Sequence, residues 1–175
     1  GGVPCAINIV GDLAAVEETF ALKLLMESLG VASIDCRQDG TRLDPTLGRA
    51  TYVFNSTIAG IEDADAVLLV GTNPRKEAPV LNARIRKCWR QMRTPIGVIG
   101  ENVDLTYDYA YLGAGPQTLA DLAAGKGAFF EVLSKAERPL IIVGQGALTR
   151  EDGLAVLATA AKLAKAVGAV GEGWN

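Results

Sequence analysis

The feature that most constrains this chain is a short apolar run at residues 66–70, followed at once by a glycine turn and a helical pattern. The run lacks polar alternation, which is typical of a strand covered on both faces of a parallel sheet. The four residues that follow favour a turn, since Gly and Asn tolerate unusual backbone angles and proline donates no ladder hydrogen bond: Gly71, Thr72, Asn73 and Pro74. Residues 66–70 are therefore predicted to form a central strand that ends at this turn.

An amphipathic helix is predicted to begin at Pro79, because proline suits the first helical turn and its φ is already fixed. Apolar side chains recur at helical spacing along one face: Leu81, Ile85, Cys88, Trp89 and Met92. Basic side chains occupy the rest of the circumference: Arg84, Arg86, Lys87, Arg90 and Arg93. In an open α/β sheet, the loop between such a strand and helix lies at the carboxyl edge, where ligands usually bind.

The same alternation of strand and helix recurs along the whole chain. Strands are predicted at residues 6–10, 31–36, 66–70, 96–99 and 139–143. Helices are predicted at residues 13–29, 56–61, 79–93, 116–124, 128–135 and 150–167, and residues 37–48 and 101–115 are predicted to be irregular. Buried strands that alternate with helices favour a three-layer α/β/α fold with a mainly parallel sheet.

The first helix should be capped by Asp12 and should bury one apolar face: Leu13, Val16, Phe20, Leu24 and Leu29. A length of 175 residues is consistent with a single domain over residues 1–175. Gly1-Gly2 without a starting Met, and a Trp in a glycine-rich tail, indicate a domain excised from a larger subunit.

Composition excludes several classes of function. The chain has no histidine, and Cys5, Cys36 and Cys88 are too far apart for a zinc or iron–sulfur motif, so no metal site is predicted. Three dispersed cysteines and no signal-peptide pattern favour a reducing compartment. A net charge of −3 argues against nucleic-acid binding, and the longest apolar runs are too short for membrane insertion.

Two glycine turns are candidate ligand sites. The turn at Gly71 could place phosphate on exposed N–H groups with help from Arg75 and Lys76, but it lacks a glycine-rich fingerprint and a purely structural loop is the alternative. The turn at residues 144–146 follows a strand, yet Thr149 replaces the third glycine of a dinucleotide fingerprint, so we interpret it as a structural turn.

The basic helix and the scattered carboxylates are further candidates. The face formed by Arg84, Arg86, Lys87 and Arg90 could dock an acidic partner or could simply be solvated. Capping roles are predicted for the carboxylates near strand ends, because no histidine or metal accompanies them: Asp12, Glu101, Asp104 and Asp108.

Long blocks of the sequence resemble a known family, at residues 54–62, 64–75, 77–87, 104–107, 112–116 and 139–148. They are similar to the large peripheral-arm iron–sulfur subunit of respiratory NADH:quinone oxidoreductase (complex I). The C-terminal part of that subunit is similar to molybdopterin oxidoreductases of the formate dehydrogenase and DMSO reductase type.

The resemblance implies a Rossmann-like domain with no cofactor of its own. It implies that the iron–sulfur clusters lie in an N-terminal region outside this chain, and that the partners are other peripheral-arm subunits. It also implies a peripheral position on the cytoplasmic side of the inner (plasma) membrane.

In the molybdenum enzymes of this family, a Gly-x-Asn-Pro turn and an Asp-Pro-Arg-like turn after the next strand hold the guanine dinucleotide of the cofactor. The first corresponds here to residues 71–74, whereas Gly100-Glu101-Asn102 replaces the second. The leading hypothesis is therefore a structural, non-redox module. The alternative is a domain that still binds a nucleotide or molybdopterin guanine dinucleotide at Gly71, Thr72, Asn73 and Pro74. Residues 139–146 are also similar to thiamine-diphosphate enzymes, but no Gly-Asp-Gly motif accompanies them.

Overall fold

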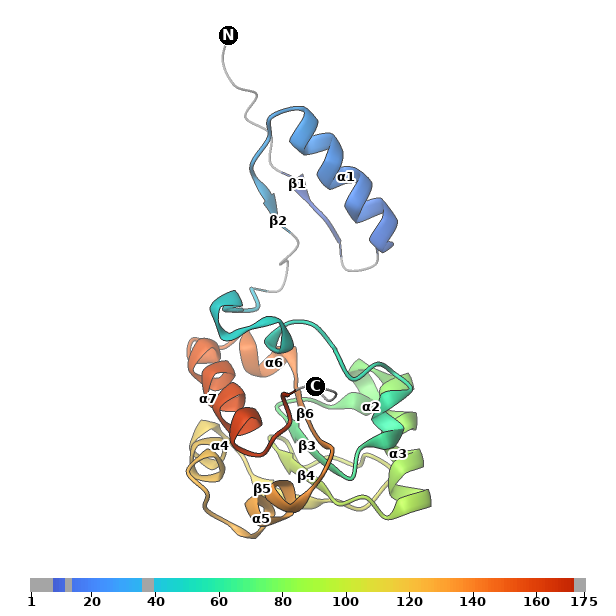
Figure 1. Ribbon diagram of the computed structural model, residues 1–175, viewed down its shortest axis with the longest axis vertical. Helices are drawn as coiled ribbons and strands as arrows, with labels where there is room; N and C mark the ends of the chain where they lie inside the picture. The colour runs from blue at the N-terminus through green and yellow to red at the C-terminus, as the bar shows by residue number, and fades with distance from the viewer. Residues whose placement is uncertain (1–7, 12–13, 36–39, 172–175) are drawn as a thin grey trace. The chain divides into compact units, whose positions relative to one another are not determined.

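The computed structural model describes residues 8–11, 14–35 and 40–171, and the chain divides into two compact units at residues 1–41 and 42–175. The single domain expected over residues 1–175 stays a prediction. Unit 1 contains strand β1 (Asn8–Ile9), helix α1 (Val16–Ser28) and strand β2 (Ile34–Asp35). The two strands are parallel, with Asn8 opposite Ile34, so unit 1 is a small βαβ element (Figure 1).

The prediction that α1 buries an apolar face is wrong. No residue of α1 is buried, and Val16, Phe20, Leu24 and Leu29 are exposed. The physical reason is size, because the described residues of unit 1 supply two strands of two residues each, and these cannot cover a 13-residue helix. The predicted cap Asp12 and the neighbouring Leu13 lie outside the described residues. Instead, Ala15 precedes the helix and its N–H donates to Glu18 Oε2 at 3.1 Å.

Unit 2 is built on a four-stranded parallel sheet in the order β5-β4-β3-β6. Its strands are β3 (Ala66–Val70), β4 (Ile96–Ile99), β5 (Ala110–Gly113) and β6 (Pro139–Val143). Val67 pairs with Ile96 of β4 and with Leu140 of β6, so β3 is the central strand that the sequence predicted. All five residues of β3 are buried.

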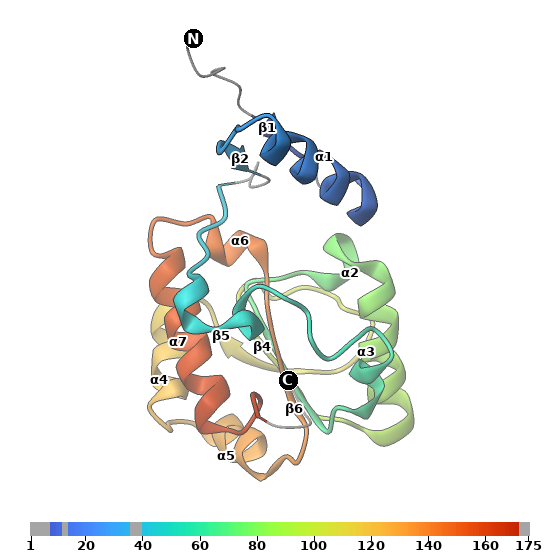
Figure 2. The same ribbon diagram turned by 45° about the horizontal axis from the view of Figure 1, so that its top comes forward.

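Helices cover both faces of this sheet (Figures 1 and 2). Helix α3 (Pro79–Met92) and the 3₁₀ helix η3 (Gly60–Asp63) lie on one face. Helices α4 (Pro116–Ala123), α5 (Ala128–Lys135) and α7 (Gly153–Ala166) lie on the other. Short helices α2 (Pro74–Glu77) and α6 (Gln145–Leu148) follow β3 and β6.

The uninterrupted apolar run of β3 feeds two separate cores. Leu68 packs in the cluster that includes Phe129 and Leu163, whereas Val67 packs in the cluster that includes Ile85. Successive side chains of a strand point to opposite faces, so a strand between two helix layers needs apolar residues at every position. The predicted three-layer α/β/α architecture is confirmed in unit 2.

Several elements of unit 2 differ from the sequence prediction, among them α2 and α6, which begin inside segments expected to be turns. The helix expected at residues 56–61 is absent, because Thr57 adopts a left-handed φ of 61° and its Oγ1 accepts a hydrogen bond from Gly60 N at 3.0 Å. Because of this turn, the helical segment begins only at Gly60, as the 3₁₀ helix η3. Residues 101–115 are not wholly irregular either, since β5 pairs with β4 at the sheet edge.

The segment before β3 contains two 3₁₀ turns. The turn η1 (Pro45–Leu47) lies within residues 37–48, which were predicted as a loop, and η2 (Arg49–Thr51) lies just after them. Helix α7 begins at Gly153 rather than at residue 150, because the Asp152 carboxylate pairs with Arg150 instead of capping. Among the described residues, no helix is long and apolar enough to cross a membrane.

Candidate functional site

A pocket of about 280 Å³ lies in unit 2 at the carboxyl ends of the parallel strands. Loops that follow all four strands of the sheet contribute to its wall. The lining includes Gly71, Thr72, Asn73, Glu77, Glu101, Pro116, Ala147 and Arg150. This is the edge at which open α/β sheets usually bind ligands.

Glycines let the loops after β3 and β6 touch at the base of the pocket. Gly71 has a left-handed φ of 58°, and a Cβ there would lie 2.5 Å from Ala147 Cβ. A Cβ on Gly144 would lie 2.4 Å from the carbonyl oxygen of Gly71. Both distances are far inside van der Waals contact, so these glycines are required by packing.

The carboxylate of Glu77 closes the turn after β3. Glu77 Oε1 accepts a hydrogen bond from Asn73 N at 2.6 Å, and Oε2 accepts one from Thr72 Oγ1 at 2.9 Å. Pro74 is buried at the first position of α2. The structure therefore confirms a turn at the pocket over residues 71–73, with Pro74 already in α2, while ligand binding by Gly71, Thr72, Asn73 and Pro74 stays a prediction.

One buried polar atom of the turn, Asn73 Oδ1, accepts no hydrogen bond from any described residue. A buried carbonyl oxygen without a donor costs about 1–3 kcal/mol, so such an atom calls for an explanation in the site.

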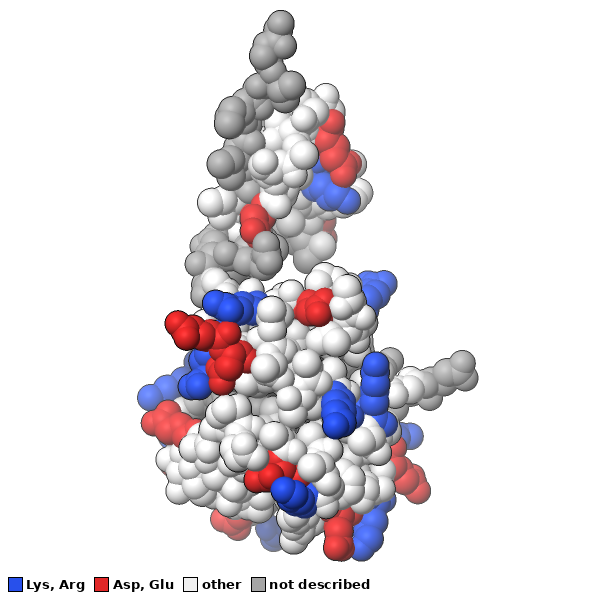
Figure 3. All heavy atoms as spheres, turned by 90° about the vertical axis from the view of Figure 1, so that its left-hand side faces the viewer, with Lys and Arg blue, Asp and Glu red and all other residues white. Residues whose placement is uncertain are grey.

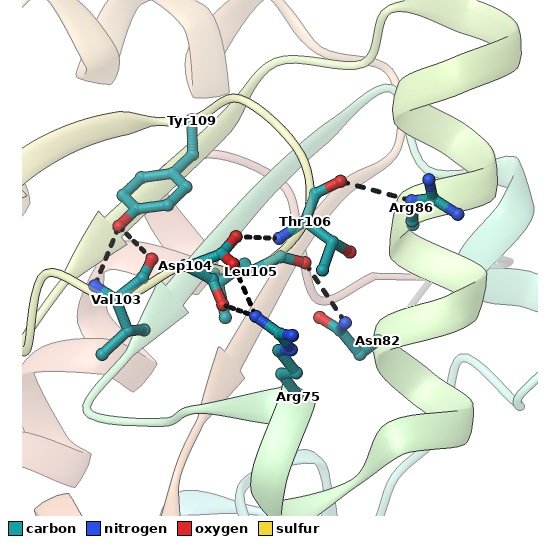
Figure 4. A network of polar contacts seen from close by, with 8 residues as sticks. All are labelled: Arg75, Asn82, Arg86, Val103, Asp104, Leu105, Thr106 and Tyr109. Carbon is teal, nitrogen blue, oxygen red and sulfur yellow. Dashed lines mark hydrogen bonds and ion pairs between the residues drawn. The ribbon is translucent and has the colours of Figure 1, made fainter.

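The basic residues expected to help bind phosphate, Arg75 and Lys76, do not line the pocket. Arg75 Nη1 lies 2.6 Å from Asp104 Oδ2 and also donates to the Asp104 carbonyl oxygen at 3.0 Å (Figure 4). The backbone N–H of Thr106 and then Arg75 lower the pKa of Asp104.

The charges that do line the pocket are mainly acidic. Glu77 and Glu101 contribute carboxylates, and the guanidinium of Arg150 is paired with Asp152, with Nε 2.7 Å from Oδ1. This pairing lowers the pKa of Asp152. Two carboxylates and a neutralised arginine make the pocket unfavourable for an anion.

The loop between β4 and β5 is anchored by its tyrosines. The hydroxyl of Tyr109 accepts a hydrogen bond from Val103 N at 3.0 Å (Figure 4). Tyr107 Oη donates to Asn82 Oδ1 at 2.8 Å, and Asn82 Nδ2 donates to the Leu105 carbonyl oxygen at 3.3 Å. Burial raises the pKa of Tyr107. These contacts fasten the loop to α3.

The carboxylate roles are mixed. Asp104 Oδ1 accepts from Thr106 N at 2.8 Å, which is the kind of backbone capping that the sequence predicted. Sequence reasoning missed Glu77 and Arg150 as pocket residues. The spacing of Glu77 four residues after Asn73 is the signal that could have revealed it, because a carboxylate there reaches back to the start of α2.

Two basic residues of α3 form ion pairs with described residues, and two others do not. Arg84 Nη1 and Lys87 Nζ both pair with the carboxylate of Glu62 in η3. Arg86 Nε instead donates to the Thr106 carbonyl oxygen at 3.2 Å. Arg90 forms no hydrogen bond or ion pair with any described residue.

No cluster of three or more potential metal-ligating side chains occurs among the described residues. Cys88 is buried, and its thiol donates to the Ile61 carbonyl oxygen at 3.1 Å. Burial raises the pKa of this thiol. Cys5 and Cys36 lie outside the described part of the chain.

The fold and the strand-edge pocket define a Rossmann-like α/β domain, and comparison with known proteins identifies its family. The molybdopterin oxidoreductase family model matches residues 4–175, so the chain belongs to the molybdopterin oxidoreductase family. A solved structure of the formyltransferase/hydrolase complex (FhcABCD) from Methylorubrum extorquens, in complex with methylofuran, shares the fold with a TM-score of 0.61. At 20% identity, covering 93% of this chain and 50% of that chain, it supports the fold alone.

Curated relatives are more specific. The chain is 40% identical over 169 residues to the NADH dehydrogenase [ubiquinone] iron-sulfur protein 1, mitochondrial, of Solanum tuberosum, covering 97% of this chain and 23% of that protein. It is 39% identical over 169 residues to a subunit of the NADH-quinone oxidoreductase of Rickettsia conorii, covering 97% of this chain and 25% of that subunit. The chain thus spans about a quarter of the length of these relatives, and the predicted resemblance is confirmed.

Proposed function

We propose that this chain is a structural, non-redox module of the large iron–sulfur subunit of a respiratory NADH:quinone oxidoreductase. In the whole complex, electrons would pass from NADH to quinone through iron–sulfur clusters held by other parts of the subunit. The similarity to two proteins that carry the names of this complex supports the assignment. We also propose that its partners are peripheral-arm subunits on the cytoplasmic side of the membrane.

The observation that carries the non-redox role is the closure of the turn at residues 71–74 by Glu77. The Asn73 N–H is a donor that a ligand phosphate would need, and Glu77 already accepts its hydrogen bond. The guanidinium groups of Arg75 and Arg150 are paired with Asp104 and Asp152. The residues present therefore do not fit the pyrophosphate of a molybdopterin guanine dinucleotide, because the Asn73 N–H and both guanidinium groups are engaged and the carboxylates of Glu77 and Glu101 would repel it.

One observation favours a second function, the binding of a nucleotide. The pocket of about 280 Å³ lies beside Asn73, whose buried Oδ1 has no donor in the described part of the chain. A base that presents N–H groups could supply that hydrogen bond, and the phosphate groups would then have to lie away from Glu77.

Calorimetric titration and thermal shift of the chain with GTP, GDP, NADH and molybdopterin guanine dinucleotide distinguish the two functions. A structural module shows no binding and no shift. Micromolar binding that is lost in Asn73→Leu, but kept in the control Asn55→Leu outside the pocket, would establish the nucleotide function instead.

A second measurement tests the non-redox role directly. The chain purified from cells should show no visible absorption from a cluster or a pterin. A chromophore in stoichiometric amount would contradict the structural role.

A further inference from the structure

The basic residues of α3 are unequally available for a partner. Arg84 and Lys87 share the carboxylate of Glu62, which offsets one of their two positive charges and holds both side chains against η3. Arg93 lies over the ring of Trp89, with its guanidinium carbon 5.2 Å from the ring centroid. The remaining two arginines of the helix, Arg86 and Arg90, lie one helical turn apart.

These two, Arg86 and Arg90, border a hollow of about 370 Å³ on the surface of α3. Arg86 is held by one bond from Nε to the Thr106 carbonyl oxygen, which leaves its terminal N–H groups without a partner among the described residues (Figure 4). Arg90 has none at all in this part of the chain. The two arginines and the hollow between them are called the Arg86–Arg90 surface.

We propose that the Arg86–Arg90 surface docks a carboxylate-bearing segment of a neighbouring protein subunit. The inference rests on the proposed function, since it treats the chain as part of an assembly. Guanidinium groups bind carboxylates through paired hydrogen bonds, and an arginine already held at one end loses less conformational entropy on binding. Arginines one helical turn apart fit acidic side chains spaced by one turn of a partner helix.

The composition of this surface favours a protein over other anions. Exposed Met92 lies on the same helix, and methionine and arginine together are enriched at protein interfaces. An anionic membrane is usually recognised by about 4–8 clustered basic residues, whereas two are available here. A chain with a net charge of −3 is also poorly suited to following a phosphate backbone.

The test uses the full-length subunit in its assembled complex. The double variant Arg86→Glu/Arg90→Glu is co-expressed with wild-type subunit, and the ratio of the two in purified complex is measured. We expect about 10- to 100-fold less variant than wild type, because like charges would now face each other.

A matched control lies on α7, a helix of the same length on the other face of the sheet. Lys162 and Lys165 are exposed there and form no ion pair with the described residues. Figure 3 shows the side of the molecule where α4 and α7 lie, with scattered charges of both signs. Lys162→Glu/Lys165→Glu should assemble into the complex as well as wild type. Equal loss in both variants, or no loss in either, would overturn the proposal.

A photo-crosslink identifies the occupant. Benzoylphenylalanine at Gln91, which also lines the hollow, should crosslink to an Asp- or Glu-containing peptide of another subunit. Replacing that acid with Lys should restore incorporation of Arg86→Glu/Arg90→Glu into the complex. Crosslinks only to lipid or nucleic acid, or to no other molecule, would refute a protein partner. Ligand titration and absorption test the proposed function separately, so the two can fail independently.

Discussion

Replacement of Gly71 by alanine tests the packing on which the pocket depends. An alanine there must adopt the left-handed φ of 58°, which costs about 1–2 kcal/mol for an L-residue. Its Cβ would also lie 2.5 Å from Ala147 Cβ, and overpacking of this kind costs about 1–3 kcal/mol. Gly71→Ala should therefore lower the free energy of unfolding by about 2–5 kcal/mol.

The assay is denaturant and thermal unfolding followed by the fluorescence of Trp89, which packs against the core of unit 2. A Trp174→Phe background leaves Trp89 as the single tryptophan. At about 2–4 °C per kcal/mol for a chain of this size, the expected fall in Tm is about 4–20 °C.

Gly168→Ala is the matched control, since Gly168 also has a positive φ of 74° but open space where a Cβ would lie. It should lose only the backbone cost of about 1–2 kcal/mol. In the double variant Gly71→Ala/Ala147→Gly, removing the opposing methyl group should make the combined loss smaller than the sum of the single losses. Equal destabilisation by Gly71→Ala and Gly168→Ala would refute the contact argument.

Further outcomes can be measured at Tyr107, Glu62 and Cys88. Tyr107→Phe should cost about 1–3 kcal/mol, because Asn82 Oδ1 loses its buried donor. Burial raises the pKa of Tyr107, so this tyrosine contributes its full stabilisation below its unfolded pKa of about 10, and that contribution falls as pH rises further. The loss of unfolding free energy at alkaline pH should therefore be smaller in Tyr107→Phe than in the wild type when both are unfolded with urea over a range of pH. Two basic side chains of α3 lower the pKa of Glu62, so its contribution is present above the unfolded pKa of about 4.3 and is lost in acid. Glu62→Gln should therefore destabilise the chain at neutral pH and much less at pH values below the folded pKa; equal loss at both would contradict the ion pairs. Cys88, buried and with a raised pKa, should resist iodoacetamide until the chain unfolds, and rapid labelling of the native protein would show that α3 is not packed as described.

Local sequence was sufficient where the pattern and the burial agree. Residues 66–70, 96–99, 128–135 and 139–143 form the predicted elements within the same bounds. Pro79 begins α3 as expected, because a missing N–H costs nothing at that position. These elements are defined by short-range rules that a single sequence contains.

The predictions failed where contacts with other elements of the fold decide the structure. The apolar stripe of α1 predicted a buried face, but the described part of unit 1 supplies no layer to cover it. Strand β5 escaped detection because its pairing with β4, and not its own pattern, defines it as a strand. Thr57 broke an expected helix through a backbone angle that composition does not reveal.

For the candidate site, the sequence located the turn at residues 71–74 and the basic face of α3. It could not show that Glu77 closes that turn, or that Arg75 reaches Asp104, 29 positions further along the chain. Nor could it separate Arg84 and Lys87, which pair with Glu62, from Arg86 and Arg90.

The sequence by itself determined most of the alternation of strands and helices, because hydrophobic periodicity and turn residues are local properties. The family followed from long blocks of residues that resemble it, and not from periodicity. The tertiary structure decided which charges are free, which loops meet at the pocket and which apolar faces are covered. Hydrogen bonds and ion pairs depend on distances between residues far apart in the chain, and folding alone sets those distances.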